Sequence, residues 1–363
     1  MKPTAESTNA TTTDAPGVLE ELARRADRAG ASDIHLQMVG ATARVTFRLD
    51  GVMTPDIELP APLAERVFGR IKFLARLKTY QESLPQDGRI DKSALGTRND
   101  LRVATYPTVT GEKIVLRLFQ STGVWPLAEL GLPAPAQAEL EALLRRTSGL
   151  LLLTGPAGSG KTTTIYACLQ YLATLGGRHI ITVEDPAEQV LPGVMQTEVS
   201  EARGLTFAVA ARHLLRQDPQ VLVIGEIRDE ETAKIAVRAA LTGHLVIATL
   251  HAGSCRGVFE RMHALCPDPS ALASALELVV NQRLVRRLCA ACPGPGCPKC
   301  LGTGYHGRVP VVEWLRVNDA ARAAVRRQEW TQLEPGRPLA EAAADWVRRG
   351  VTDEVEHQRL FQP

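Results

Sequence analysis

Residues 149–162 read GLLLLTGPAGSGKT, and this stretch decides the fold of the longer part of the chain. The apolar run Leu150–Leu153 predicts a buried strand, and residues 163–175 predict a helix that follows it. Between them lies the pattern G-x-x-x-x-G-K-[ST], which is typical of a loop that cradles nucleotide phosphates. Because strand, loop and helix occur in the required order, the sequence predicts a nucleotide-binding site rather than a chance glycine-rich turn.

The residues of this phosphate loop have expected roles in binding ATP. The backbone N–H groups of the loop turn toward the phosphates, and the N-terminus of the helix adds a partial positive charge. Lys161 is expected to reach the β- and γ-phosphates, and Thr162 to hold Mg²⁺ through its hydroxyl. The predicted nucleotide-binding residues are Gly155, Pro156, Ala157, Gly158, Ser159, Gly160, Lys161, Thr162 and Thr163.

Around the loop, helical patterns alternate with short apolar runs at 179–183, 221–224 and 245–249. This alternation is typical of an α/β domain with a doubly wound, mostly parallel sheet. We expect this P-loop domain to span 136–318, including a cysteine-rich segment at 289–300, and a helical, Ala- and Arg-rich region to follow at 319–363.

The front of the chain has a different pattern. Helical spacing at 17–29 and 61–78 accompanies alternating, strand-like segments near 32–53 and 100–119, which predicts a small α+β domain over 17–120. Glycine and proline cluster at 121–135 and predict a linker between the two domains.

Composition sets limits on the function. The chain has 363 residues, a formal net charge of +2 at pH 7 and 45% hydrophobic residues, which suffices for a sizeable core and argues against a nucleic-acid binder. No apolar run approaches the roughly 20 residues needed to span a bilayer. Residues 1–16 are rich in Thr, Ser and Ala and lack the apolar segment of a secretory signal, which predicts a disordered tail on a cytoplasmic protein.

Polar residues follow the predicted parallel strands. Glu184 and Glu226 come after the second and third strands, and His251 comes after the fourth, with His244 just before it. In a parallel sheet the carboxyl ends of the strands meet at one edge, so we expect these groups near the phosphate loop. The glutamates suit Mg²⁺ binding and activation of water, although a carboxylate after a strand also serves as a helix cap. The histidines suit contact with the γ-phosphate or a structural hydrogen bond.

Four of the seven cysteines lie close together near position 295. Cys289, Cys292, Cys297 and Cys300 form two C-x-x-C pairs separated by four residues that include two prolines and two glycines. Four thiolates suit a tetrahedral structural Zn²⁺, and such a site leaves no open position for catalysis. A redox-active dithiol and free structural thiols are the alternatives.

Taken together, these motifs resemble the secretion ATPases of type II secretion and type IV pilus assembly. The boxes that carry the resemblance are GPAGSGKTTTIY at 155–166, VEDPAE at 183–188, IGEIRDEETA at 224–233 and TGHLVIATLH at 242–251. Further similar segments are ASDIHL at 31–36, PQDGRI at 85–90, GEKIVLRL at 111–118, NQRLVRRLC at 281–289 and GTGYHGR at 302–308. Around the last box, Ala248, Ala252 and Gly253 replace residues that are usual in the family.

The resemblance implies more than the residues alone. It implies a RecA-like motor domain preceded by a PAS-like domain, and it places Arg89, Arg102 and Arg117 at positions that supply arginine fingers. Each of these arginines also fits an ordinary strand surface. Related assembly ATPases carry a tetracysteine zinc site that pilus retraction ATPases generally lack, so the cysteines favour an assembly or secretion motor.

The expected function is that of a homohexameric ATPase that hydrolyses ATP to drive pilus or pseudopilus assembly. The expected partners are an inner-membrane platform protein and other inner-membrane components, which would hold this cytoplasmic protein at the membrane. Two alternatives are an ATPase of the type IV secretion or conjugation type, against which the cysteine pairs argue, and a nucleotide-gated scaffold without turnover. Lys161, Glu184 and Glu226 argue against the scaffold.

Overall fold

The computed structural model of the chain describes residues 14–98, 100–118, 123–292, 294 and 296–362. Its contacts divide the chain into two compact units, which we treat separately. Unit 1 contains Met1–Ser121 and Cys289–Gly307, and unit 2 contains Thr122–Leu288 and Arg308–Pro363. The cysteine segment 289–300, expected within the 136–318 domain, therefore groups with unit 1. The tail expected at 1–16 lies outside the described residues up to residue 13, and a helix already begins at Ala15.

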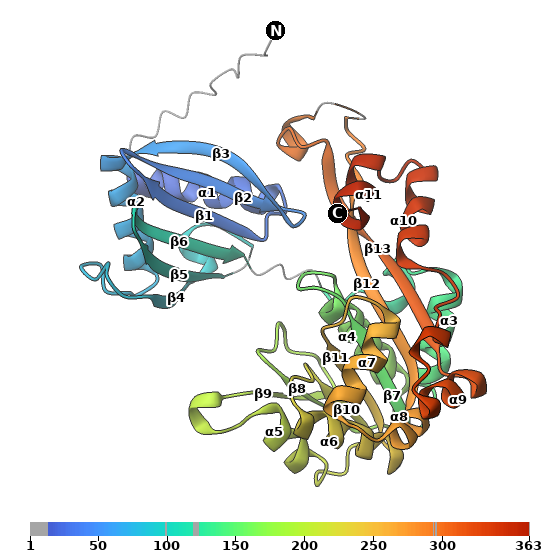
Figure 1. The fold of residues 1–363 in the computed structure, drawn as a ribbon. Coiled ribbons are helices and arrows are strands. Elements are labelled where there is room, and N and C mark those ends of the chain that lie inside the picture. The colour runs from blue at the N-terminus through green and yellow to red at the C-terminus, as the bar shows by residue number, and fades with distance from the viewer. Residues whose placement is uncertain (1–13, 99, 119–122, 293, 295, 363) are drawn as a thin grey trace. The chain divides into compact units, whose positions relative to one another are not determined.

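Unit 1 is built on a six-stranded antiparallel sheet in the order β3-β2-β1-β6-β5-β4 (Figure 1). Its elements are α1 (Ala15–Arg28), β1 (Asp33–Val39), β2 (Thr42–Leu49), β3 (Val52–Pro60), α2 (Ala61–Leu74), β4 (Gln86–Ile90), the short 3₁₀ helix η1 (Lys92–Ala94), β5 (Leu101–Thr108) and β6 (Gly111–Leu118). A further 3₁₀ helix, η4 (Pro298–Cys300), lies in the cysteine segment.

The two long helices of unit 1 cover one face of this sheet. Leu19 and Leu22 of α1 and Ile71 of α2 are buried in one apolar cluster with Ile34 of β1 and Leu116 of β6. Because successive side chains of a strand point to opposite faces, the residues between these apolar positions occupy the other face. That second face carries polar and charged side chains, as an antiparallel sheet with one covered face permits.

Unit 2 is built on a seven-stranded sheet in the order β13-β12-β7-β11-β10-β8-β9. The pairings from β12 through to β9 are all parallel. The strands are β7 (Gly149–Thr154), β8 (Ile180–Glu184), β9 (Val194–Glu198), β10 (Val221–Ile224), β11 (Leu245–Leu250), β12 (Leu276–Leu288) and β13 (Tyr305–Arg316), the last of which begins in unit 1.

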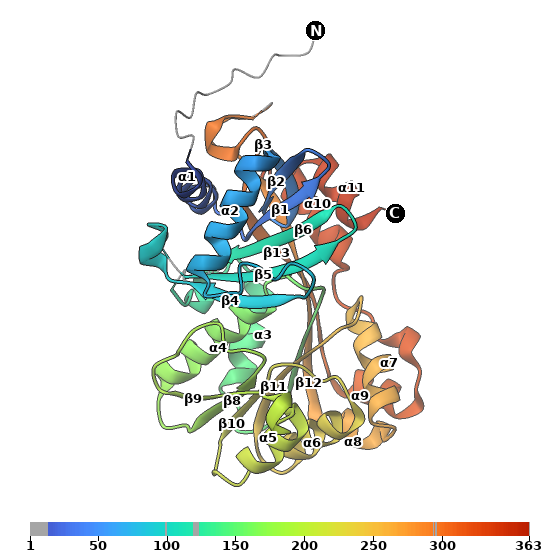
Figure 2. The ribbon, with the colours of Figure 1, turned by 90° about the vertical axis from the view of Figure 1, so that its left-hand side faces the viewer.

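The helices of unit 2 are α3 (Ala134–Leu144), α4 (Lys161–Leu175), α5 (Phe207–Leu214), α6 (Glu230–Leu241), α7 (Cys255–Leu265), α8 (Pro269–Ala275), α9 (Asp319–Arg327), α10 (Leu339–Arg348) and α11 (Glu354–Phe361) (Figure 2). Short 3₁₀ helices lie at η2 (Leu127–Glu129), η3 (Glu201–Arg203) and η5 (Trp330–Gln332). None of the helices in the described part of the chain has the length and apolar character needed to cross a membrane.

Helices cover both faces of the seven-stranded sheet. Alternate residues of β7 enter different cores: Leu150 and Leu152 pack in the cluster with α5 to α8, whereas Leu151 and Leu153 pack in the cluster with α3 and α4. All six residues of β7 are buried. A strand buried on both faces reads as a continuous apolar run, which is why the sequence predicted this α/β fold correctly.

Four strands were not expected from the sequence: β4, β9, β12 and β13. Strands β12 and β13 are long and carry several arginines, including Arg286 and Arg316, so they lack the apolar run of a doubly buried strand. Strand β12 nevertheless lies beside β7, with Asn281 paired with Thr154 at the end where the phosphate loop begins. This pairing brings residues 282–284 against the loop.

Candidate nucleotide-binding and hydrolysis site

The phosphate loop connects β7 to α4, as the sequence predicted. Its glycines are required by geometry, because Gly155 and Gly160 have φ values of 138° and 88°, in the region that favours glycine. A Cβ on Gly155 would lie 2.3 Å from the carbonyl oxygen of Gln282, and one on Gly160 would lie 2.6 Å from the Gln282 side chain. The loop is therefore seated tightly on β12.

Gln282 is a residue that the sequence-based search missed. It is buried, and its Oε1 accepts a hydrogen bond of 2.8 Å from the hydroxyl of Thr164 on the first turn of α4. The motif NQRLVRRLC was recognised by resemblance, but no role was expected for its glutamine. The structure shows that Gln282 packs closely against Gly155 and Gly160 of the loop and bonds to the first turn of α4.

A pocket opens beside the loop at the carboxyl ends of the parallel strands. It is lined by Lys161, Thr162, Ile165, Tyr166, Glu184, Asp185, Pro186, Glu188, Phe207, Val223, Gly225, Glu226, Arg228 and Thr249. Four predicted site residues, Lys161, Thr162, Glu184 and Glu226, thus line one pocket. The hydroxyl oxygen of Thr162 and the carboxylate oxygens of the two glutamates are the kind of ligand that a hard cation such as Mg²⁺ takes.

Lys161 is the cation of this pocket that stands nearest the loop backbone. Its Nζ donates to the carbonyl oxygens of Gly155, at 2.8 Å, and Pro156, at 3.0 Å. Burial lowers the pKa of Lys161, Glu226 opposes this change, and the nearby Arg283 adds to it. Arg283 of β12 is a second cation that was not predicted, and its buried Nε has no hydrogen-bond partner among the described residues. The two positive groups make this region suitable for anionic phosphates.

Glu184, at the end of β8, is buried and held by three donors. Its Oε2 accepts from the hydroxyl of Tyr166 at 2.6 Å, and its Oε1 accepts from Thr182 at 2.5 Å and from Gln196 at 3.0 Å. Burial and the bond to Glu184 raise the pKa of Tyr166, so the tyrosine stays protonated and donates. The carboxylate of Glu184 is therefore fixed in one orientation at the pocket wall.

Glu226, after β10, contacts a different set of groups. Arg228 donates from its Nε to Glu226 at 2.8 Å and lies 3.2 Å from Asp185, and its guanidinium packs over the ring of Phe207. His251 Nε2 lies 3.2 Å from the carboxylate of Glu226, and its Nδ1 lies 3.2 Å from the carbonyl oxygen of Gly155. His251 thus bridges Glu226 and the phosphate loop.

His244 does not join this group. It precedes β11, and its carbonyl oxygen accepts from the N–H of Gly149, the first residue of β7. Its Nδ1 lies 3.0 Å from the carbonyl oxygen of Ala239. A six-residue strand spans about 20 Å, so the expected position of His244 near the loop is wrong: it lies at the opposite edge of the sheet from His251.

The three predicted arginine fingers lie in unit 1 on a single row across the sheet. In the register of the strands, Arg89 lies opposite Arg102, Arg102 lies opposite Arg117, and Arg117 lies opposite Asp33 of β1. Arg48, which was not predicted, continues the row on the other side of Asp33. Asp33 accepts from Arg117 at 3.0 Å and lies 3.3 Å from Arg48, and Asp100 pairs with Arg89. We call Arg48, Asp33, Arg117, Arg102 and Arg89 the charged row.

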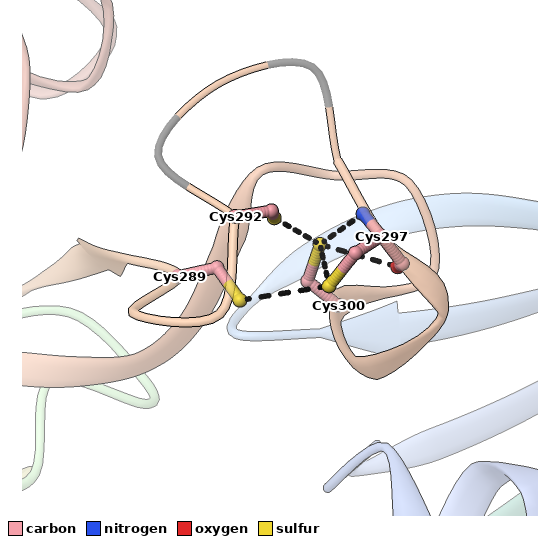
Figure 3. Close-up of side chains that lie close together, drawn as sticks. All are labelled: Cys289, Cys292, Cys297 and Cys300. Carbon is pink, nitrogen blue, oxygen red and sulfur yellow. Dashed lines mark hydrogen bonds between the residues drawn. The ribbon is translucent and has the colours of Figure 1, made fainter.

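The four clustered cysteines point toward one another, with all four Sγ atoms within 4.8 Å of each other (Figure 3). The Sγ separations are 3.9 Å for Cys289–Cys297, 3.5 Å for Cys292–Cys300 and 3.8 Å for Cys297–Cys300. Four sulfurs at about 2.3 Å from a tetrahedral zinc lie about 3.8 Å apart, so these thiols fit that ion. Although burial opposes it, hydrogen bonds from backbone N–H groups lower the pKa of Cys300 to about 6.

The cysteine segment also contacts the rest of unit 1. The N–H of Gly307 donates to Asp50 of the turn between β2 and β3 at 2.9 Å, and Leu301 packs against the apolar core of that unit. A metal in the cluster would therefore order a segment that already rests on the antiparallel sheet.

Comparison with known proteins gives the chain its context. The sequence profile described as Type II/IV secretion system protein matches residues 12–359. The chain is 40% identical over 359 residues to the type II secretion system protein HxcR of Pseudomonas aeruginosa, covering 94% of this chain and 76% of that protein. It is 37% identical over 381 residues to the type II secretion system ATPase E of Vibrio cholerae, covering 96% of this chain and 76% of that protein.

Other relatives are longer than the region they share with the chain. The type II secretion system protein E of Pectobacterium carotovorum is 41% identical over 323 residues, which are 82% of this chain but 65% of that protein. Among solved structures, the pilus retraction motor PilT with bound ADP matches with a TM-score of 0.66 at 28% identity, over 95% of this chain and 97% of that one. The match confirms the predicted α/β fold, in which a small α+β domain precedes a P-loop domain with a mostly parallel sheet.

Proposed function

The chain is an ATPase of the type II/IV secretion system protein family, and from this premise we propose that it is the motor that drives pilus or pseudopilus assembly. The observation that carries the proposal is the convergence of Lys161, Thr162, Glu184 and Glu226 on one pocket at the carboxyl edge of a parallel sheet. This is where nucleotide sites form in open α/β sheets.

The roles follow from the chemistry of each group. Lys161 and the loop N–H groups hold the β- and γ-phosphates, and Thr162 and Glu226 supply oxygen ligands for Mg²⁺. Bound there, Mg²⁺ neutralises charge that develops on the phosphates. Glu184 orients or activates the attacking water, which its three fixed donors support by holding the carboxylate in place. His251 links Glu226 to the loop, so it is suited to report on the γ-phosphate.

The arginines of the charged row are proposed to stabilise charge on the phosphoryl group as it is transferred. Arg89 and Arg117 have side chains that are 70% and 68% exposed, so their guanidinium groups are available to an anion while Asp100 and Asp33 orient them. An arginine used in this way contributes about 10³-fold or more to turnover in other nucleotide hydrolases.

The wider proposal concerns assembly. A homohexameric ring in the cytoplasm is proposed to bind an inner-membrane platform protein and other inner-membrane components, and to pass them the work of ATP hydrolysis. The four cysteines are proposed to bind one structural Zn²⁺ per chain, and the match of their separations to tetrahedral geometry supports this ion.

The experiment that tests the activity is ATP turnover by the purified full chain with Mg²⁺ and with a chelator. Wild type is expected to hydrolyse ATP only with Mg²⁺, and Glu226→Gln to bind ATP while its kcat falls at least about 100-fold. Glu201→Gln, at an exposed glutamate of the same unit, is the matched control and should behave as wild type. Wild type that binds ATP and never turns it over, even with its platform partner, would establish the scaffold alternative instead.

A further inference from the structure

Behind the loop that carries His251, unit 2 buries a carboxylate that lines no part of the nucleotide pocket. Glu313 of β13 is 5% exposed, and no ion pair within the described residues includes it. Its Oε1 accepts from the N–H of Cys255 at 2.7 Å and from Asn281 Nδ2 at 3.1 Å, and its Oε2 accepts from the N–H of Leu339 at 3.1 Å. A buried carboxylate held this way has a specific structural task.

Two of these donors are the first residues of helices. Cys255 begins α7 and Leu339 begins α10. The first N–H groups of a helix have no partner within it, and the helix dipole favours a negative charge there. Pro338, the N-cap of α10, provides no side-chain cap, so Glu313 supplies the acceptor from another strand. One carboxylate thus joins the starts of two helices.

The third donor, Asn281, connects this carboxylate to the His251 loop. Its Nδ2 donates both to Glu313 and to the carbonyl oxygen of Gly253, the latter at 3.1 Å. The neighbouring Ala252 exchanges two hydrogen bonds with the hydroxyl of Thr154, at 2.8 and 3.0 Å. The loop is therefore held at Ala252 and Gly253, the two residues that follow His251.

The same loop carries His251, which contacts the site. His251 lies 3.2 Å from Glu226 and 3.2 Å from the Gly155 carbonyl oxygen, as described above. A loop displaced by one ångström would break both contacts, since hydrogen bonds weaken steeply beyond their usual lengths. The position of His251 thus depends on Thr154, Asn281 and Glu313.

We propose that Glu313 and Asn281 are positioning residues for ATP turnover, which hold the 251–255 loop so that His251 stays between Glu226 and the phosphate loop. The proposal rests on the function proposed above. Glu313 also accepts a hydrogen bond from the first residue of α10, so under this proposal the start of α10 influences turnover through Glu313. A glutamine cannot replace the glutamate, because its amide offers one acceptor oxygen and places a donor against an N–H.

The first arm of the test is steady-state kinetics of the full chain carrying Glu313→Gln. We expect kcat per folded chain to fall about 10- to 100-fold while the Kd for ATP stays within about threefold, because Lys161 and the loop N–H groups do not contact Glu313. Glu356→Gln is the matched control, since Glu356 is also buried in unit 2 but pairs with Arg286 and Arg359. It should lower stability and leave kcat within about twofold.

A double-mutant cycle separates positioning from general loss of stability. If Glu313 acts through His251, its substitution should have little further effect on kcat in a His251→Ala background. Asn281→Ala should lower kcat about tenfold and keeps the test usable should Glu313→Gln fail to fold. Additive effects of Glu313→Gln and His251→Ala, or equal kcat losses in Glu313→Gln and Glu356→Gln, would overturn the proposal.

A second arm does not need turnover and so distinguishes failure of this inference from failure of the proposed function. Amide hydrogen exchange in the full chain should quicken at residues 251–258 in Glu313→Gln and Asn281→Ala, and should not change there in Glu356→Gln. Unchanged exchange in that segment would overturn the inference even if wild type is an active ATPase. Faster exchange there would support the part of the inference that Glu313 and Asn281 hold the loop, whatever the turnover of wild type.

Discussion

The two sheets of the molecule carry their charged residues in different places. The antiparallel sheet of unit 1 has one face covered by α1 and α2, and its other face bears the charged row from Arg89 to Arg48. The parallel sheet of unit 2 is covered on both faces, so its functional groups stand at the carboxyl ends of strands. An antiparallel sheet with one covered face can present charged side chains on its open face. A parallel sheet that is covered on both faces can present them only at the ends of its strands.

The largest expected effect is on ATP turnover, from a change at the carboxyl ends of the parallel strands in unit 2. Lys161→Ala removes the cation that we propose to hold the phosphates, so we expect ATP turnover to fall by about 1000-fold or more, and nucleotide affinity to fall with it. Turnover and the Kd for ATP are both measured on the full chain. Lys234→Ala, at an exposed lysine on α6 that pairs with Glu230, is the control and should not change either value. Wild-type turnover in Lys161→Ala would place the hydrolysis site elsewhere.

The next largest effect is on kcat, from a change in the charged row on the open face of the sheet in unit 1. Arg117→Ala should lower kcat about 100-fold with ATP affinity within about threefold, because an arginine finger acts on the transition state. The loss is smaller than for an arginine finger that acts alone because Arg89 and Arg102 remain in the row. Arg44→Ala is the matched control: Arg44 is an exposed arginine on the same face, outside the charged row, and pairs with Glu58. Equal kcat in the two variants would reduce the row to an ordinary sheet surface.

An intermediate effect, on stability, concerns the cysteine cluster of unit 1. Wild type should contain about one zinc per chain, and Cys300→Ser should lose most of it and melt a few degrees lower. Cys266→Ser, at a cysteine outside the cluster, should keep the metal. Metal analysis of fresh protein and thermal unfolding give both values, and wild type free of metal would reject the zinc site.

The smallest expected effect is a pH dependence of stability in unit 2. Burial alone would raise the pKa of Glu356, but hydrogen bonds from Arg359 and Arg286 outweigh burial and lower this pKa below the usual glutamate range. A depressed pKa stabilises the fold above the usual value, and this contribution is lost as pH falls through the lower, folded-state value. Glu356→Gln should thus be less stable by about 3 kcal/mol at neutral pH, with the gap narrowing in acid.

Denaturant unfolding of wild type and Glu356→Gln from about pH 7 to about pH 3 measures that gap. Thr352→Val, at a buried polar residue nearby in the chain, is the control because it changes no titratable group. A gap that stays constant over the range would show that the ionised carboxylate of Glu356 contributes nothing specific.

Much of this organisation could be predicted from the sequence because it is local. The apolar run of β7, the glycine loop and the start of α4 are adjacent in the chain, and each signal supports the others. Strand β12 was not predicted because its second half carries arginines and its partner β7 is far away in sequence. The neighbours of Glu184 were missed for the same reason, since Tyr166 and Gln196 reach it from separate elements.

The position of His244 shows how closeness along the chain can mislead. His244 and His251 are seven residues apart in sequence, and both flank β11. A strand separates its two ends by its full length, so only the residue after the strand reaches the carboxyl edge. The alternation of faces likewise placed the predicted arginines in one row, which the sequence alone did not reveal because the register of antiparallel pairing sets it.

The central claim is that the carboxyl edge of the parallel sheet is a site of Mg²⁺-dependent ATP hydrolysis. A structure of the full chain determined with Mg²⁺ and a non-hydrolysable ATP analogue tests it most directly. We predict that the phosphates lie on the N–H groups of residues 155–162, with Lys161 on the β- and γ-phosphates and with Glu184 and Glu226 facing the γ-phosphate. Nucleotide bound away from this loop, or a γ-phosphate that reaches neither glutamate, would contradict the account.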